Sequence, residues 1–231
     1  MCNDQSDGKK LDTFKEDQYV WRQTDRSVSK GKQLDLRERI IHETLKLFSL
    51  KGYSNTSIED ILSRAHASKG GFYNHFKSKD QLFMTVLSEA RKIWRNRVLD
   101  GLDQTRSPLM KMRKILENFR DLYLKDSENI PGGCVFVTLL VELDDQRPDF
   151  AKEISEGFSR VLLLMNRLLE EAKASGELGP EVDADAVSRV LFVGLLGASV
   201  LYGVDKSSEE LAKSVDPLIG YLDNVYNAKH A

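Results

Sequence analysis

The chain has 231 residues, 41% of them hydrophobic, and a formal net charge of −2 at pH 7, which fits a soluble globular protein large enough to bury a core. Its two cysteines exclude a disulfide framework, and the spacing of its cysteines and histidines matches no metal site. Residues 30–80 hold ten basic and six acidic residues, a balance typical of a nucleic-acid-facing module on a larger body, although a solvated charged surface would have the same composition.

Residues 1–33 are polar and have no sustained hydrophobic period, which predicts a flexible leader. The stretch Met1–Lys10 lacks an apolar segment, so we expect no secretory signal there. Lys30 and Lys32, near the end of the leader, are suited to contacting DNA phosphates as an arm. In the rest of the chain the apolar residues recur with helical spacing, and strictly alternating clusters of Val, Ile and Thr are missing. We therefore expect an all-α fold.

A first strong helix is predicted from Leu34 to Lys51, because its apolar residues form a stripe with a period of about 3.6 residues. Gly52 supplies the left-handed position that follows the last turn of many helices. Tyr53 then provides the apolar contact back onto that turn. The helix is expected to end there.

Two short helices are predicted next, covering about residues 58–65 and 68–76. Either Thr56 or Ser57 can cap the first of them, and Thr56 with Glu59 matches a capping box. A tight connection of about three residues joins the two helices. Two short helices joined in this way, between two longer helices, are typical of a helix-turn-helix DNA-binding motif.

The second short helix begins with two adjacent glycines, which cost about 1 kcal/mol each relative to alanine. Gly70 and Gly71 allow the backbone of the first turn to lie against phosphates or base edges, with its free N–H groups and positive dipole end toward the anion. Phe72 and Phe76 are four residues apart and are expected to anchor the helix to the core. The alternative interpretation is a glycine-rich loop that joins core helices.

The polar residues of this stretch have the chemistry of DNA contacts. Lysine, tyrosine and histidine are good phosphate partners, and Asn74 is suited to reading an adenine edge in the major groove. In the alternative interpretation Tyr73 and His75 pack within the protein. The expected phosphate partners are Lys69, Tyr73, His75 and Lys79.

These segments carry a family resemblance. Residues 52–53 read GY, residues 56–61 read TSIEDI, and residues 68–83 read SKGGFYNHFKSKDQLF. Together they closely resemble the DNA-binding domain of the TetR family of bacterial repressors, over about residues 35–87. The family usually has Gly-Val where this chain has His66-Ala67, so we expect His66 to adopt a left-handed conformation.

The resemblance implies a helix-turn-helix DNA-binding domain at residues 34–80. In the family, residues matching Thr56, Lys69, Tyr73, His75 and Lys79 commonly bind phosphates, and those matching Gly71 and Asn74 face bases. The DNA-binding residues expected from the pattern and the resemblance together are Thr56, Ser57, Ser68, Lys69, Gly70, Gly71, Tyr73, Asn74, His75 and Lys79.

The remainder, residues 81–231, is predicted to be a larger helical domain for effector binding and dimerisation. Ser78 caps a long helix, and Pro108 opens another. After a break at residues 130–133, an apolar helix runs from Cys134 to about residue 143. Its Gly-Gly-Cys opening and its later carboxylate, Glu142, resemble the C-terminal domain of one subset of TetR-like proteins.

A helix at about residues 150–174 has apolar spacing suited to helix pairing, and a helix at about 184–202 carries small residues that let backbones approach closely. A final helix is expected at about 208–226. The resemblance implies that the two pairing helices meet their twins in a homodimer; an intramolecular core is the alternative. The apolar run 190–204 has about fifteen residues, fewer than the roughly twenty that cross a bilayer, so we expect a buried helix and no membrane contact. The expected dimer contacts are Phe158, Val161, Met165, Leu168, Val190, Gly194, Gly197, Ala198 and Leu201.

An apolar group in the middle of the chain is a candidate effector pocket, because small-molecule sites are mostly apolar. A solid core is the alternative for each member. Cys134 has oxidant sensing as an alternative role, but a buried free cysteine is usually inert. The candidate pocket residues are Trp94, Met112, Leu116, Phe119, Tyr123, Phe136 and Leu140.

Taken together, the pattern and the resemblance predict a cytoplasmic, dimeric transcriptional repressor. It is expected to bind a palindromic double-stranded DNA operator and to be released by a small-molecule effector that shifts the helix beginning near Ser78. A DNA-bound structural or cell-organising protein of the same fold, without an effector, is the alternative. No catalytic constellation, phosphate-cradling loop or metal spacing supports an enzyme, and no cofactor is expected.

Overall fold

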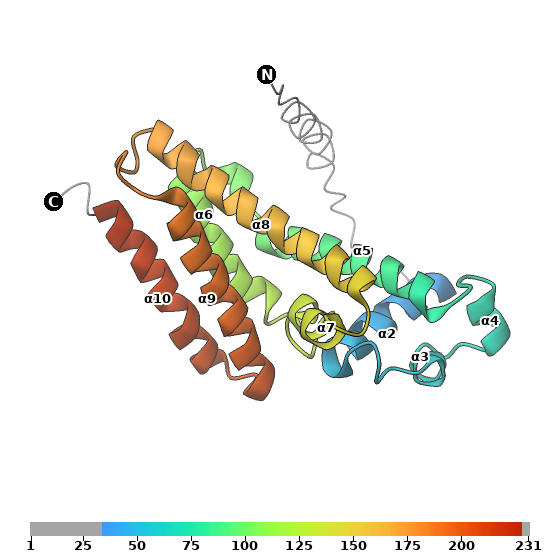
Figure 1. Ribbon diagram of the computed structural model, residues 1–231. Coiled ribbons are helices and arrows are strands. Elements are labelled where there is room, and N and C mark those ends of the chain that lie inside the picture. The colour runs from blue at the N-terminus through green and yellow to red at the C-terminus, as the bar shows by residue number, and fades with distance from the viewer. Residues whose placement is uncertain (1–33, 228–231) are drawn as a thin grey trace, which may run out of the picture. The chain divides into compact units, whose positions relative to one another are not determined.

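In a computed structural model the described residues are 34–227, and the predicted leader at residues 1–33 lies outside them. Residues 34–227 form helices and no strand, which confirms the all-α prediction (Figure 1). The first four helices are α2 (Leu36–Lys51), α3 (Ile58–Arg64), α4 (Lys69–Tyr73) and α5 (Lys79–Val98). The later helices are α6 (Pro108–Asn118), the π-helical turn η2 (Phe119–Tyr123), α7 (Val135–Leu143), α8 (Pro148–Ala174), α9 (Ala184–Asp205) and α10 (Ser208–Asn227).

Helix α3 is capped one residue later than the predicted Thr56–Glu59 capping box. Ser57 caps the helix, and its hydroxyl accepts the Asp60 amide at 3.0 Å while the Asp60 carboxylate accepts the Ser57 amide at 2.8 Å. Thr56 is fully buried, and its hydroxyl donates to the Gly52 carbonyl at 2.6 Å. The predicted capping box is therefore wrong, because the Thr56 side chain closes the preceding turn instead.

The turn between α3 and α4 has the predicted backbone conformation. His66 has a φ of +48°, the left-handed conformation expected from the family resemblance. Ser68 caps α4 by accepting the Gly71 amide at 3.0 Å. Helix α4 ends at Tyr73, shorter than the predicted 68–76, because the chain must become extended at Ser78 to cap α5.

Aromatic side chains hold the small helices together. Phe72 and Phe76 are almost fully buried, which confirms their predicted role as anchors of α4. Phe48 and Phe83 lie on α2 and α5 with ring centroids 6.0 Å apart. Helices α2, α3 and α4 gather at one end of α5 (Figure 1). The predicted domain boundary after residue 80 falls in the first turn of α5, which runs on unbroken to Val98.

Helix α9 is buried on one side only. It is long and apolar enough to cross a membrane by length and composition, as core helices of soluble proteins also are, and 39% of its apolar stretch is buried. The prediction of a buried helix is therefore only partly right. The other side carries an exposed stripe, which we call the α9 stripe, and its members are Val190, Val193, Gly197, Val200, Leu201 and Val204.

Candidate nucleic-acid interface

Helix α4 begins with two glycines that the fold treats differently. A Cβ added at Gly71 would lie 3.1 Å from Leu36 Cδ2 and 3.2 Å from Ser68 Oγ, so this glycine serves packing within the protein. A Cβ added at Gly70 would meet nothing within 4 Å. Nothing in the described fold therefore requires a glycine at position 70, and the space above it is open to a ligand at the N-terminal turn of the helix.

Most of the predicted DNA contacts are exposed on α4 and the turn that follows it. Tyr73 is 47% exposed although its ring meets that of Phe72 edge-on at 5.2 Å. The alternative in which Tyr73 and His75 pack inside the protein is wrong, because both are exposed. We call this surface the α4 face, and its exposed residues are Ser68, Lys69, Gly70, Tyr73, Asn74, His75 and Lys77.

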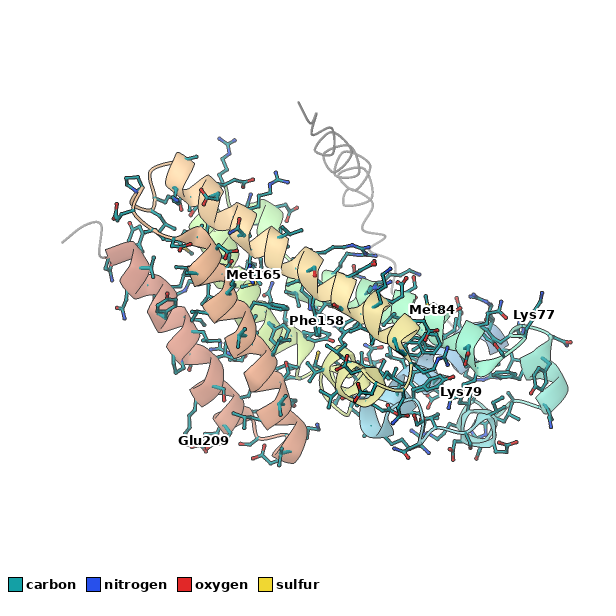
Figure 2. The ribbon with its side chains drawn as sticks, in the orientation of Figure 1. Lys77, Lys79, Met84, Phe158, Met165 and Glu209 are labelled. Atoms are coloured by element: carbon teal, nitrogen blue, oxygen red, sulfur yellow. The ribbon has the colours of Figure 1, made fainter. Side chains whose placement is uncertain are left out.

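Lys77 and Arg37 are basic residues that our residue-based prediction did not include. Lys77 is exposed directly after Phe76 (Figure 2). Arg37 is exposed on α2, and its guanidinium lies 5.5 Å from the centre of the Phe76 ring. The sequence itself shows that Lys77 is close to α4. The position of Arg37 depends on how α2 packs against Phe76, which the sequence does not show.

Lys79 lies behind the α4 face rather than on it. Its ammonium stacks over the Tyr53 ring, 3.9 Å from the centre, and the side chain is only partly exposed. Burial lowers the pKa of Lys79, while the nearby carboxylates of Glu142 and Asp80 act in the opposite direction. Burial and a hydrogen bond to Asp80 raise the pKa of Tyr53 to about 12, so its hydroxyl is a neutral donor at pH 7.

The predicted contacts before α4 are divided between the surface and the interior. Ser57 is exposed at the N-terminus of α3, where its hydroxyl and amide both meet the Asp60 carboxylate. Thr56 is buried with its hydroxyl bonded to Gly52, so its side chain does not reach the surface. The prediction that Thr56 contacts DNA therefore has no support from its position.

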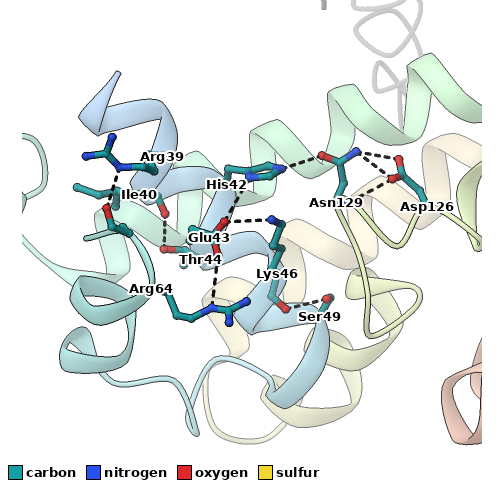
Figure 3. A network of polar contacts seen from close by, with 11 residues as sticks. Arg39, Ile40, His42, Glu43, Thr44, Lys46, Ser49, Arg64, Asp126 and Asn129 are labelled. Atoms are coloured by element: carbon teal, nitrogen blue, oxygen red, sulfur yellow. Dashed lines mark hydrogen bonds and ion pairs between the residues drawn. The ribbon is translucent and has the colours of Figure 1, made fainter. Parts of the chain in front are cut away.

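A network of polar contacts joins α2 to neighbouring segments of the chain (Figure 3). Arg39 donates to the Ala65 carbonyl at 2.8 Å and fixes the end of α3 on α2. His42 Nε2 lies within hydrogen-bond distance of Asn129 Oδ1, at 3.2 Å. Asn129 in turn donates to Asp126, a buried carboxylate that also pairs with Arg97 at 2.9 Å. The network ties α2 to the loop that precedes α7.

The candidate effector residues lie mainly in the protein core. Five of the seven are buried, and Trp94 and Leu140 are partly exposed; the five are Met112, Leu116, Phe119, Tyr123 and Phe136. An open groove of about 680 Å³ lies instead beside α7 and α8. Of the seven, Leu140 lines that groove, together with Val141, Asp144, Pro148, Ala151, Lys152 and Ser155.

Cys134 is buried at the start of α7, and the Tyr123 hydroxyl lies 3.6 Å from its sulfur. Burial raises the pKa of the Cys134 thiol, so it is neutral at pH 7. We expect Cys134 to react with iodoacetamide about tenfold more slowly, or slower still, in the native protein than in the same protein unfolded in urea. Mass spectrometry of the modified Cys134 peptide measures both rates, and equal rates would contradict this expectation.

The expected dimer contacts do not form one surface. Met165, Leu168 and Ala198 are buried inside the subunit, and assigning them to a surface between subunits is wrong because they pack in its core. Phe158 meets Phe192 of the same chain edge-on at 5.7 Å. The remaining expected contacts are Val161 and Gly194, which are partly buried, and Val190, Gly197 and Leu201, which belong to the exposed α9 stripe.

Two family profiles match the chain. The family described as "Bacterial regulatory proteins, tetR family" matches residues 40–86, and "Tetracyclin repressor-like, C-terminal domain" matches residues 108–216. An uncharacterised HTH-type regulator from the lacX 3′ region of Lactococcus lactis is 34% identical over 53% of this chain and 62% of its own length. The HTH-type transcriptional repressor DhaR of a Mycobacterium species is 23% identical over 83% of this chain and 96% of its own length.

Solved structures have the same fold. A TetR transcriptional regulator from Chloroflexus aurantiacus has a TM-score of 0.74 and 28% identity, covering 81% of this chain and 94% of its own. A cysteine-substituted form of the regulator CifR, solved with 26-bp double-stranded operator DNA, has a TM-score of 0.66 and 19% identity, covering 83% of this chain and 98% of its own.

Proposed function

The chain belongs to the TetR family of bacterial transcriptional regulators, and from this premise we propose that it is a repressor that binds a palindromic operator as a homodimer and leaves it when a small-molecule effector binds. The observation that carries the DNA-binding role is the α4 face. It combines an exposed glycine that the fold does not require with exposed lysine, tyrosine, asparagine and histidine side chains within one short segment. Relatives named as repressors, DhaR among them, support the direction of regulation.

We infer the following roles for the α4 face. The first turn of α4, with its free amides and positive dipole end, approaches the phosphate backbone above Gly70. Lys69, Tyr73 and His75 are placed to bind phosphates, and Asn74 is placed to read a base edge. Ser57 at the N-terminus of α3 is a further phosphate partner, and Lys77 joins the set on the strength of its exposure.

Phosphate contacts predict a specific change in the salt dependence of binding. We expect Lys69→Ala and Lys77→Ala each to weaken binding to every DNA sequence and to lower the slope of log K against log salt by about 1. Lys213→Ala on α10 is the matched control, because that lysine is exposed and pairs with Glu209 at 2.8 Å on a helix far from α4. Fluorescence anisotropy over a salt series measures the slopes, and unchanged slopes in both test variants would contradict the assigned roles.

The α9 stripe is the surface we propose for the homodimer. Its residues recur at three- and four-residue intervals along one side of α9, a spacing suited to helix pairing, and Val204 at its end is 82% exposed. A second copy of the chain would cover this stripe around a two-fold axis. A partner at this surface would also bury apolar side chains of α9 that one subunit alone leaves in water.

We propose the usual domain roles for the two parts of the chain. Residues 34–80 form the DNA-binding domain, and residues 81–231 form the effector-binding and dimerisation domain. The family consists of soluble DNA-binding regulators, and we place this protein in the cytoplasm with them. Its relatives are regulators rather than enzymes.

Selection of bound DNA from a random pool tests the proposal. A repressor of this kind is expected to enrich one palindromic sequence, whose genomic position identifies the regulated genes. Compounds related to those genes are then added to the complex, and at least one is expected to weaken operator binding. Many scattered, unrelated sites and no response to any compound would favour a DNA-bound structural protein of the same fold instead.

A further inference from the structure

A carboxylate of the larger domain holds the turn that leads into the helix-turn-helix. Glu142, in the last turn of α7, accepts the Tyr53 amide at 2.7 Å with Oε2 and the Ser54 amide at 2.5 Å with Oε1. Both oxygens are therefore bound to backbone N–H groups just beyond the end of α2. A hydrogen bond to an ionised acceptor is stronger than a neutral one, and two parallel bonds also fix the direction of approach.

Gly52 leaves the room that this carboxylate needs. Its φ of +79° is a backbone conformation that side chains rarely adopt, and a Cβ at this position would overlap the Glu142 carboxylate. The glycine thus serves two purposes, the end of α2 and the close approach of α7. Glu142 and Gly52 form one contact, built from two distant parts of the chain.

The same corner of the larger domain holds the start of α5. We call residues 142–150 the α7–α8 corner. Arg147 pairs with Asp80 in the first turn of α5 at 3.1 Å and lies over the Phe150 ring at 3.7 Å. Phe150 stacks on Phe83 of α5, with ring centroids 4.0 Å apart. The Tyr53 hydroxyl also donates to Asp80, so the two held segments are joined to each other.

These contacts determine how freely the DNA-binding domain can turn. Helix α5 is its covalent connection to the rest of the chain, and one helix leaves rotation about its own start unrestricted. Attachments at the turn after α2 and at the start of α5 restrict that rotation, in addition to the contacts of Asn129 and Gly132 with α2. A dimer that reads two half-sites one helical turn apart requires a fixed separation and orientation of its two recognition helices.

We propose that Glu142 is a positioning residue for operator recognition, because its carboxylate on the Tyr53 and Ser54 amides fixes the orientation of the DNA-binding domain and thereby the half-site spacing that the dimer accepts. This role rests on the proposed function of the protein as a dimeric operator-binding repressor. Glu142 itself is partly buried against the turn after α2 and is not among the residues placed in the DNA contact surface.

The spacing of the half-sites provides a direct test. The DNA is the operator selected by the wild-type chain, together with versions that carry one or two inserted or deleted base pairs between the half-sites, and a single half-site. One inserted base pair moves a half-site by about 3.4 Å and rotates it by about 34°. We expect this change to weaken wild-type binding by about 30-fold or more, within the range of typical coupling between sites.

The Glu142→Gln variant is expected to lose this selectivity. It should bind the original operator about tenfold more weakly and discriminate against the altered spacings by about threefold or less, with unchanged affinity for the single half-site. The half-site result is the readout that a merely unfolded domain would change. Asp145→Asn is the matched control, because this exposed carboxylate lies on the same corner and makes no hydrogen bond or ion pair within residues 34–227.

Glu142→Asp keeps the charge but shortens the side chain, so it should show an intermediate spacing profile, and it decides the question if Glu142→Gln does not fold. A wild-type spacing profile in the folded Glu142 variants would overturn the role of Glu142 alone. A wild-type chain that tolerates the altered spacings itself would contradict the proposed function, and the role of Glu142 with it.

Discussion

Replacing Val193 with glutamate is expected to convert the dimer into a monomer and to lower operator affinity by about 100-fold or more, because two linked half-site contacts become two separate ones. Val193 is 63% exposed on the α9 stripe, near the middle of α9, where a partner subunit would cover it. A carboxylate there would have to lose its water against apolar side chains without a cationic partner. Sedimentation velocity measures the oligomeric state, and a binding titration with the selected operator measures the affinity.

Met110→Glu is the matched control for the Val193 variant. Met110 is 52% exposed on α6, outside the α9 stripe, so a carboxylate there remains in water. This control should remain dimeric and bind the operator as the wild-type chain does. A Val193→Glu protein that stays dimeric would show that the subunits pair through another surface.

The DNA-binding domain was predictable because its signals are local. Caps such as Ser68 and Ser78 lie within three residues of the amides they accept, so the sequence pattern contains both partners. The left-handed conformation of His66 followed from the family resemblance, in which a glycine usually stands at this same position. The error at Thr56 arose where two adjacent hydroxyls were both suitable caps, and burial of the first decided between them.

The dimer contacts were predicted less well because helical period does not say which side of a helix faces a partner. Helix α9 carries apolar residues around most of its circumference, so Ala198 inside and Val193 outside look alike in the sequence. On α8, Met165 and Leu168 follow the same spacing as an exposed interface would. The burial of each residue within the subunit separates the two groups.

The contact between Glu142 and the turn after α2 could not be predicted from the sequence pattern. Glu142 and the amides it accepts are separated by 88 and 89 residues, and nothing in their local spacing connects them. The family resemblance pointed to a carboxylate at this position without giving its partner. Only the packing of α7 against the end of α2 shows what Glu142 holds.

Gly132→Ala is expected to lower the free energy of unfolding by about 3 kcal/mol, because the new methyl group would overlap the backbone carbonyl of Ser49 rather than a movable side chain. Gly132 lies in the loop before α7, and its amide donates to Ser49 Oγ at 3.1 Å. Its carbonyl accepts Lys206 Nζ at 2.5 Å, at the end of α9. The substitution therefore strains the point where α2 of the DNA-binding domain and the end of α9 meet the same loop.

Urea unfolding at one fixed protein concentration measures this loss, since the stability of a dimer depends on concentration. Gly203→Ala is the matched control: Gly203 lies inside α9, and a Cβ there meets nothing within 4 Å. The control should gain about 1 kcal/mol from the better helix propensity of alanine. Stability equal to that of the wild-type chain in Gly132→Ala would mean that the loop can move away from α2, which would contradict the expected strain.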